Sequence, residues 1–196
     1  MIAVILAAGA GRRLGKGPKA LVQLGHSTLA ERATATAIQA GLTPLVLAAP
    51  QVADTLRTLL APDADVQAVP DHASGISASI KQAARRLHQA HPHEPVMLWL
   101  VDQPGITVDV IKRISAAHQA GTITRASYEG VPAHPVLFDP GDFQQAAESA
   151  TGNVGAKEFL RMHRHRVTLI ECGDIGSAAD LDTAEDYRRW AEAFEA

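Results

Sequence analysis

Residues 2–21, IAVILAAGAGRRLGKGPKAL, join a short apolar run to a loop of glycine and basic residues. The run Ile2–Leu6 does not alternate with polar residues, which is typical of a strand buried on both faces of a parallel sheet. Glycine and alanine in the loop let backbone N–H groups approach an anion closely. The loop also carries four cationic side chains, Arg12, Arg13, Lys16 and Lys19. The stretch therefore predicts a phosphate site after the first strand of an α/β sheet.

The rest of the first 120 residues alternates between short apolar runs and helical patterns. Further strands are expected at 45–47, 66–69 and 96–101. Helices are expected from Thr28 to Gly41 and over 51–60, 76–91 and 108–119. Thr28 and Glu31 have capping-box spacing, and Gly121 is expected to close the last of these helices in a left-handed conformation. The alternation predicts right-handed βαβ units and a mostly parallel sheet.

The pattern changes after residue 120. A hairpin is expected, with strands over 123–128 and 135–138 joined across Glu129 and Gly130. A helix, a strand over 167–170 and a last helix from Thr183 are expected to follow. No linker, repeat or low-complexity segment separates two domains. We therefore expect a single-domain, three-layer α/β/α, Rossmann-like fold over residues 1–196, with a mostly parallel sheet and a small antiparallel addition.

Composition excludes several classes of protein. The 18 Lys and Arg residues against 21 Asp and Glu residues give a net charge of −3, which argues against a nucleic-acid partner. With 46% hydrophobic and 20% charged residues, the chain is expected to fold. Its longest apolar run, Ile2–Ala8, is far shorter than the ~20 residues of a membrane span, so no membrane partner is expected. A single cysteine, Cys172, cannot form an internal disulfide and favours a cytoplasmic location.

The charge is unevenly distributed along the chain. Residues 1–30 contain four cations and no acid, whereas residues 171–196 contain eight acids and two arginines. A local positive region in a nearly neutral chain suits one small polyanionic ligand better than a long polyanion.

Three interpretations of the glycine loop compete. A P-loop needs Ser or Thr after its lysine, but Gly17 follows Lys16. A dinucleotide loop needs an acidic residue at the end of the second strand, and that strand ends in the sequence Leu47-Ala48-Ala49-Pro50. A solvated turn does not explain four cations without an acid. The P-loop is therefore excluded, and the dinucleotide loop and the solvated turn stay open as less favoured interpretations.

The segment 6–21, LAAGAGRRLGKGPKAL, resembles the signature of the MobA-like NTP transferase family, LAAGxxxRMG followed by a lysine. Five further segments resemble motifs of that family in the same order: HASGISASI (72–80), VDQP (101–104), AHPVLF (133–138), GNVGAK (152–157) and DLDTAED (180–186). LAAG, DQP and HPVLF resemble the MocA-like branch of molybdenum cofactor cytidylyltransferases. The resemblance implies the nucleotide-diphospho-sugar transferase (GT-A-like) form of the fold, with a nucleotide-binding half over 1–120 and an acceptor-binding half over 121–196.

The resemblance implies a reaction and its ligands. The enzyme would transfer CMP from CTP to the phosphate of molybdopterin, or of the molybdenum cofactor, and release pyrophosphate. It would need Mg²⁺, for which Mn²⁺ could substitute. By the same resemblance, the nucleotide would contact Leu6, Ala7, Ala8, Gly9, Gly11, Arg12, Lys19, Gly75 and Ser77. Arg12, Lys19 and Asp102 would be catalytic. For Ser77, simple helix capping is an equally good interpretation.

Asp102 is the expected metal ligand because it follows the most hydrophobic strand, where open α/β sheets place their ligands. The alternative is that Asp102 caps a helix that begins near Thr107. Asp182 is the candidate second carboxylate, although residues 182–185 also have the spacing of a capping box for the last helix.

His134 and Gln103 are the candidate acceptor contacts, as the resemblance implies. The chain departs from the family pattern at three nearby positions: Ala133 replaces a glycine, Asn153 an acidic residue and Lys157 an arginine. The nucleotide half is therefore better supported than the identity of the acceptor.

Two other functions remain open. Some relatives in this branch are described as oxidoreductases that act on nicotine-derived pigments, which would require a nicotinamide cofactor. The chain could also be a non-catalytic maturation factor for molybdenum hydroxylases, although Lys19 and Asp102 are both retained. A molybdenum hydroxylase is a possible partner, and a monomer or weak dimer is expected.

Overall fold

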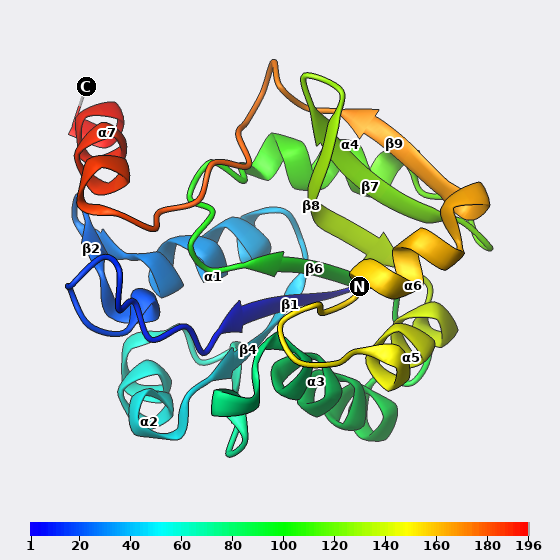
Figure 1. Ribbon diagram of the computed structural model, residues 1–196, viewed down its shortest axis with the longest axis horizontal. Coiled ribbons are helices and arrows are strands. Elements are labelled where there is room, and N and C mark those ends of the chain that lie inside the picture. The colour runs from blue at the N-terminus through cyan, green and yellow to red at the C-terminus, as the bar shows by residue number, and fades with distance from the viewer. Residues whose placement is uncertain (196) are drawn as a thin grey trace.

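The computed structural model describes residues 1–195, in which seven strands form one mixed sheet in the order β5-β4-β1-β6-β8-β7-β9 (Figure 1). The strands are β1 (Ile2–Ala7), β4 (Thr43–Ala48), β5 (Asp65–Ala68), β6 (Val96–Leu100), β7 (Ile123–Tyr128), β8 (Val131–Phe138) and β9 (Val167–Glu171). The first four in the sheet order are parallel, β8 is antiparallel to both its neighbours, and β9 is parallel to β7. The expected mostly parallel α/β fold with an antiparallel addition is confirmed.

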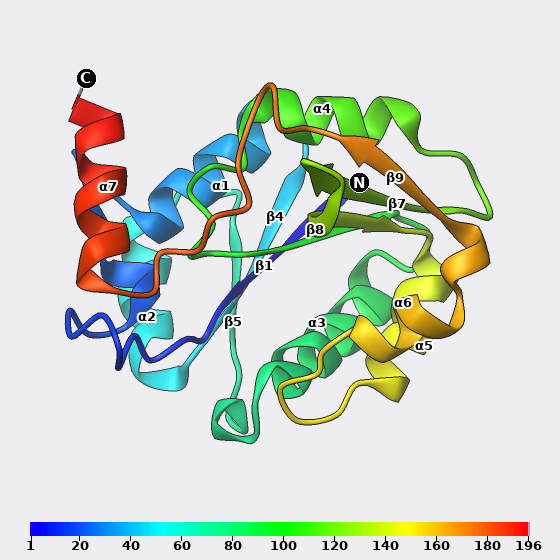
Figure 2. The ribbon, with the colours of Figure 1, turned by 45° about the horizontal axis from the view of Figure 1, so that its top comes forward.

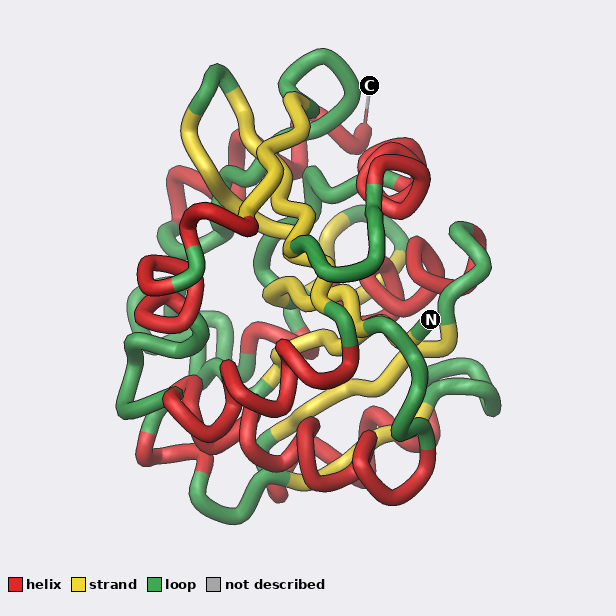
Figure 3. Tube along the Cα trace, turned by 90° about the vertical axis from the view of Figure 1, so that its right-hand side faces the viewer, coloured by secondary structure: helices red, strands yellow, loops and turns green. Residues whose placement is uncertain are grey.

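Helices cover both faces of this sheet (Figures 2 and 3). The first face carries α1 (Leu29–Gln39), α2 (Pro50–Leu59) and α4 (Val108–Ala117), and α7 (Ala184–Glu195) packs against the edge of the same core beyond the ends of the strands (Figure 1). The second face carries α3 (Ile76–Ala90), α5 (Pro140–Ser149) and α6 (Lys157–Met162). In β1, Ala3 and Ile5 pack toward the first face and Val4 and Leu6 toward the second. Burial on both sides explains why this strand lacks polar alternation.

The predicted capping box of α1 is present. The Oγ1 atom of Thr28 accepts the Glu31 N–H at 3.1 Å, and the Glu31 carboxylate accepts the Thr28 N–H at 2.8 Å. The helix predicted over 108–119 ends two residues early, at Ala117. His118 leaves the helix because its ring contacts Thr124 Oγ1 at 3.0 Å and Asp139 Oδ1 at 3.1 Å. Gly121 has the expected positive φ, +83°, but turns the following loop instead of capping the helix.

The predicted hairpin turn is also present, since Glu129 and Gly130 have φ angles of +52° and +76°. Strand β8, however, begins at Val131, four residues earlier than predicted. The register passes from Ser127↔Pro132 to Arg125↔Val136, so three residues of β8 lie opposite one residue of β7. The bulge interrupts the apolar pattern of β8, and the buried apolar residues begin only at Pro135, where the strand was predicted to start. A further two-stranded hairpin, β2 (Gln23–Leu24) and β3 (Ser27–Thr28), is too short to leave a sequence pattern.

Glu171 at the end of β9 holds the hairpin turn. Its carboxylate accepts the Ser127 hydroxyl at 2.8 Å and the N–H groups of Glu129, Gly130 and Gly173 at 2.9 to 3.1 Å. These bonds, with that of Ser127 the largest cause, lower the Glu171 pKa to about 2 from a usual 4.5.

A pH-dependent stability is expected from Glu171. Because the pKa of this group is lower in the folded state, its stabilisation is complete above pH ~4.5 and is lost as the pH falls toward 2. Wild type should melt at a higher temperature than Glu171→Gln at pH 7, and the difference should shrink between pH 4.5 and 2. Thermal melts of both proteins across this range measure the effect, and a difference that stays constant with pH would contradict it.

None of the helices in residues 1–195 combines the length and the apolar character needed to cross a bilayer.

Candidate active site

A cleft of about 590 Å³ opens at the carboxyl ends of β1 and β6, toward which both arrows point in Figure 1. The glycine loop, the start of α3 and the segment before α7 surround it. Its lining residues are Leu6, Ala8, Gly9, Ala10, Gly11, Arg12, Arg13, Lys19, His72, Ala73, Gly75, Ile76, Ser79, Leu100, Val101, Asp102, Asn153 and Asp182. Most of the predicted nucleotide residues therefore lie together, at the sheet edge where α/β proteins bind ligands.

The glycine loop folds back on itself. The Lys19 N–H donates to the Gly9 carbonyl at 3.1 Å, and the Gly15 N–H donates to the Gly11 carbonyl at 3.1 Å. Gly11 has a φ of +64°, and a Cβ atom at this position would lie 2.0 Å from the Gly17 carbonyl oxygen. Only glycine fits there, so the loop's shape depends on this residue. Arg12 is exposed on the rim of the cleft.

Lys19 follows the loop in a short 3-10 turn (Lys19–Leu21), and its ammonium forms ion pairs with both Asp102 and Asp182. The three side chains are only 13%, 15% and 24% exposed. Burial acts to lower the Lys19 pKa, but the hydrogen bonds and charges of Asp102 and Asp182 together raise it above its usual value. Lys19 therefore stays protonated and offsets part of the charge of the two carboxylates.

Asp102 does not cap the following helix. The N-cap of α4 is Thr107, whose Oγ1 accepts the Val110 N–H at 3.2 Å. The Asp102 side chain is thus free to contact Lys19, and its backbone carbonyl accepts the Leu181 N–H at 2.8 Å. This second bond fixes the segment before α7 to the end of β6.

Asp182 is likewise not part of a helix cap. The capping box lies one residue later than the predicted 182–185: the Asp186 N–H donates to Thr183 Oγ1 at 3.2 Å, and the Thr183 N–H donates to the Asp186 carboxylate at 2.9 Å. The Asp182 carboxylate instead contacts Lys19 and Arg13, the latter at 2.8 Å. The side chains of Lys19 and Asp182, about 160 residues apart in the sequence, therefore meet at the edge of the cleft.

The residues at this point fit a hard divalent cation. Oxygens of Asp102 and Asp182 converge on the Lys19 ammonium at the edge of the cleft. Mg²⁺ commonly takes one or two carboxylates, with waters and substrate phosphates as its other ligands. Within residues 1–195 no group of three or more His, Cys, Asp or Glu side chains could hold a metal by itself. The arrangement therefore suits a cation that arrives with a nucleotide.

Ser77 is placed differently from the prediction. It is 6% exposed, its N–H donates to the Gly152 carbonyl at 3.0 Å, and it does not line the cleft. Ser79 lines the cleft instead, four residues after Gly75 and so on the same face of the helix. Gly75 itself has a φ of +103°, and a Cβ atom there would lie 2.5 Å from Asn153 Oδ1.

His134 and Gln103, the predicted acceptor contacts, lie outside the cleft lining. His134 is in β8, where burial first, and then the charges of Arg125 and Lys157, lower its pKa to about 4. Gln103 is 7% exposed, and its Nε2 donates to Asp180 Oδ1 at 3.0 Å. Neither residue lines the cleft, and their contact with an acceptor remains a prediction.

Nine residues of the cleft lining were not among the predicted nucleotide or metal contacts: Ala10, Arg13, His72, Ala73, Ile76, Ser79, Leu100, Val101 and Asn153. Arg13 had a signal, since it belongs to the basic loop. Asn153 belongs to the GNVGAK segment. This segment packs on the start of α3, since a Cβ atom added at Gly155 would lie 3.3 Å from the Ile76 side chain. His72 opens the HASGISASI segment, but only the folded chain brings the short turn before α3 to the cleft.

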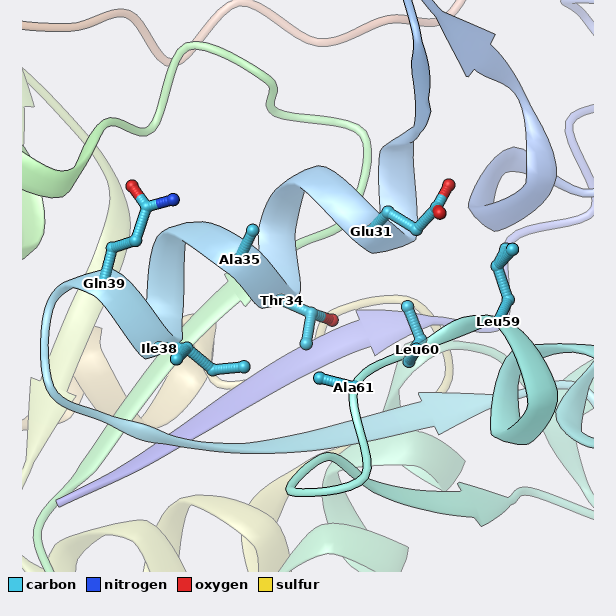
Figure 4. Close-up of a pocket in the computed structure, with 8 residues that line it drawn as sticks. All are labelled: Glu31, Thr34, Ala35, Ile38, Gln39, Leu59, Leu60 and Ala61. Carbon is cyan, nitrogen blue, oxygen red and sulfur yellow. The ribbon is translucent and has the colours of Figure 1, made fainter.

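A second hollow of about 260 Å³ lies between α1 and the C-terminal end of α2 (Figure 4). Thr34, Ile38 and Leu59 are among its lining residues. No predicted site residue lines this hollow, so it is separate from the active-site cleft.

Several known proteins resemble this chain over nearly its whole length. Nicotine blue oxidoreductase of Paenarthrobacter nicotinovorans is 35% identical over 197 residues, which cover 95% of this chain and 94% of that protein. The crystal structure of Rv0371c from Mycobacterium tuberculosis H37Rv matches with a TM-score of 0.80 and 29% identity, covering 97% and 96% of the two chains. A complex of Rv0371c with manganese matches with a TM-score of 0.76 and 27% identity, over 98% of each chain.

A nucleotidyl transferase from Methanothermobacter thermautotroptrophicus shares the fold, with a TM-score of 0.79 and 20% identity, over 98% and 96% of the two chains. The model of the MobA-like NTP transferase domain matches residues 3–167, a range that includes the glycine loop, Lys19 and Asp102. The chain therefore belongs to the MobA-like NTP transferase domain family, which implies nucleotidyltransferase activity.

Proposed function

We propose that this protein transfers CMP from CTP to the phosphate of molybdopterin or the molybdenum cofactor, and releases pyrophosphate. The observation that carries the proposal is Lys19, held between Asp102 and Asp182 at the edge of a cleft lined by the glycine loop. This combination offers backbone donors for a triphosphate, an ammonium for a phosphate and a pair of carboxylates for a divalent cation.

The reaction makes one bond and breaks another at the α-phosphorus. An oxygen of the acceptor phosphate attacks this phosphorus in line, and the bond to the β-phosphate oxygen breaks, so that pyrophosphate leaves with the electron pair. Gly11 and Arg12 would hold the β- and γ-phosphates at the loop. Lys19 would stabilise the charge that develops on the α-phosphate. The acceptor phosphate is already ionised, so no general base is assigned.

Asp102 and Asp182 are the residues that would hold Mg²⁺ or Mn²⁺. When bound, the cation neutralises phosphate charge and orients the leaving pyrophosphate. The complex of Rv0371c with manganese supports a divalent cation at this site. The Lys19 ammonium occupies the position between the two carboxylates in this structure and would have to leave it.

Base selection is proposed to come from the backbone of residues 6–9. Leu6 and Gly9 line the cleft, while Ala7 is 1% exposed and could contribute only through its backbone. Backbone groups suit the small edge of a pyrimidine, which supports CTP as the nucleotide. His134 and Gln103 are proposed for the acceptor half, and a molybdenum hydroxylase is proposed as the recipient of the product.

A second candidate is an oxidoreductase that uses a nicotinamide cofactor. It is favoured by one observation, the 35% identity to a protein named nicotine blue oxidoreductase. The end of β4 argues against it, because Ala48 is followed by Ala49 and Pro50 and so offers no carboxylate for a ribose. The ion pairs of Lys19 also suit phosphate transfer better than hydride transfer.

A thermal-shift panel separates the two candidates. CTP with Mg²⁺ at about 100 times its Kd should stabilise the fold by about 2.7 kcal/mol and raise the melting temperature by roughly 5–10 °C. GTP, ATP, NADH and NADPH should have smaller effects, and omitting Mg²⁺ should reduce that of CTP. Stabilisation by NADH or NADPH, with none by any nucleoside triphosphate, would overturn the transferase proposal.

A further inference from the structure

Arg125 in β7 is a half-buried arginine that has no carboxylate partner within residues 1–195. Its Nε donates to the Ala133 carbonyl at 3.0 Å and its Nη2 to the Pro132 carbonyl at 3.1 Å. Burial lowers the pKa of Arg125, yet a guanidinium remains charged in proteins. The two carbonyls at the β8 bulge therefore hold the group in place without neutralising it. A cation that is partly desolvated and uncompensated is costly unless an anion approaches it.

Lys157 is a second cation without an acidic partner in the described part of the chain. It is the exposed first residue of α6. The adjacent acid, Glu158, is already bonded to Arg161, with Arg161 Nε donating to it at 3.0 Å. No neighbour in the sequence is therefore free to neutralise Lys157.

His134 shows that the two charges act on the same region. Burial is the largest cause of its low pKa, about 4, and the positive charges of Arg125 and Lys157 add to the effect. The imidazole is therefore neutral near pH 7, while its backbone carbonyl accepts the Tyr128 hydroxyl at 3.1 Å. The region holds two positive charges around a neutral, largely buried ring.

This region adjoins the nucleotide cleft. Strand β8 is the neighbour of β6, whose Leu100 lines the cleft. Asn153, also in the cleft lining, lies four residues before Lys157. Ile123 packs on the sheet face that carries α3, α5 and α6, and Arg125, two residues later in the same strand, points to that face. Both cations therefore lie on the side of the sheet where an acceptor would meet the nucleotide.

We propose that Arg125 and Lys157 form an anion subsite that binds a phosphate monoester group of the acceptor. This inference rests on the proposed function, because it supplies the acceptor with a site next to the nucleotide. Two polyanions repel each other, and a fixed guanidinium can offset that repulsion through paired hydrogen bonds to phosphate oxygens. The Nη1 group of Arg125 makes no hydrogen bond to residues 1–195 and is available for this contact.

The direct test follows the Arg125 Nε–H resonance by NMR during titration with inorganic phosphate, with sodium acetate at matched ionic strength as the comparison. The resonance, assigned by its loss in Arg125→Gln, should shift saturably with phosphate and not with acetate. Lys157→Gln, an exposed substitution that should not affect folding, is expected to weaken phosphate binding about tenfold. Arg85→Gln, on the exposed side of α3, is the matched control and should bind like wild type.

Absence of a saturable shift, an equal shift with acetate, or unchanged binding in Lys157→Gln would overturn the subsite. The kinetic counterpart is a rise of about tenfold or more in the acceptor KM of Lys157→Gln, with the nucleotide KM unchanged. Failure of the proposed function is distinguishable, because CTP would then fail to stabilise the protein while the phosphate titration still saturates at Arg125.

Discussion

Replacing Asp102 with asparagine is expected to reduce pyrophosphate release by at least about 10²-fold while the protein remains folded. Asparagine has the same shape but cannot supply the charge that a divalent cation requires. The fold should persist because Lys19 keeps its ion pair with Asp182, and because the Asp102 backbone carbonyl still accepts the Leu181 N–H. Pyrophosphate release measured against Mg²⁺ concentration, together with a thermal melt, tests both halves of this expectation.

Asp54→Asn is the matched control for Asp102→Asn. Asp54 is 93% exposed on α2 and contacts only surface neighbours such as Arg57, at 2.5 Å. Its substitution should leave both turnover and its dependence on Mg²⁺ unchanged. Wild-type turnover in Asp102→Asn would mean that another carboxylate holds the cation, and unfolding of that variant would mean that the charge is structural.

The fold could be predicted where local signals and burial agree. The β1 strand is apolar on both faces because Ile5 and Val4 pack against opposite helix layers. The cap of α1 could be predicted from two residues, Thr28 and Glu31, because a capping box is a local structure. The start of β8 could not be predicted, because a bulge separates its first residues, Val131 and Pro132, from the apolar part of the strand.

The candidate site was predictable in its parts but not in its assembly. The sequence places Lys19 after the glycine loop and Asp102 after β6, and both line the cleft. The role of Asp182 depended on where α7 is capped, and one residue decides it: Thr183 caps the helix and leaves Asp182 free. Ser79 lines the cleft in place of Ser77 because of how α3 is rotated about its own axis, and sequence spacing alone does not determine that rotation.

Charge explains why these distant segments meet. The glycine loop supplies the cations Arg13 and Lys19, and the segment before α7 supplies Asp182. Burial, and then the nearby Asp102 charge, raise the Asp180 pKa. A cation bound at Asp102 and Asp182 would compensate the carboxylates and release Lys19 toward a phosphate. The same residues can therefore stabilise the empty cleft and serve the reaction.

Lys19→Met is expected to change turnover and cation binding in opposite directions. Turnover should fall by about 10²–10³-fold, because the ammonium that stabilises the α-phosphate is lost. Affinity of the nucleotide-free protein for Mn²⁺ should rise by about tenfold, because the cation no longer competes with an ammonium between Asp102 and Asp182. Methionine retains most of the side-chain volume, so the partly buried site should remain filled.

Steady-state kinetics with CTP and titration with Mn²⁺, followed by electron paramagnetic resonance, measure the two effects. Lys16→Met is the matched control, since Lys16 lies over the Tyr187 ring at 4.2 Å and contacts neither Asp102 nor Asp182. It should leave both quantities near their wild-type values. Unchanged turnover in Lys19→Met would remove Lys19 from the transition state. Unchanged Mn²⁺ affinity would show that the ammonium and the cation do not share the two carboxylates.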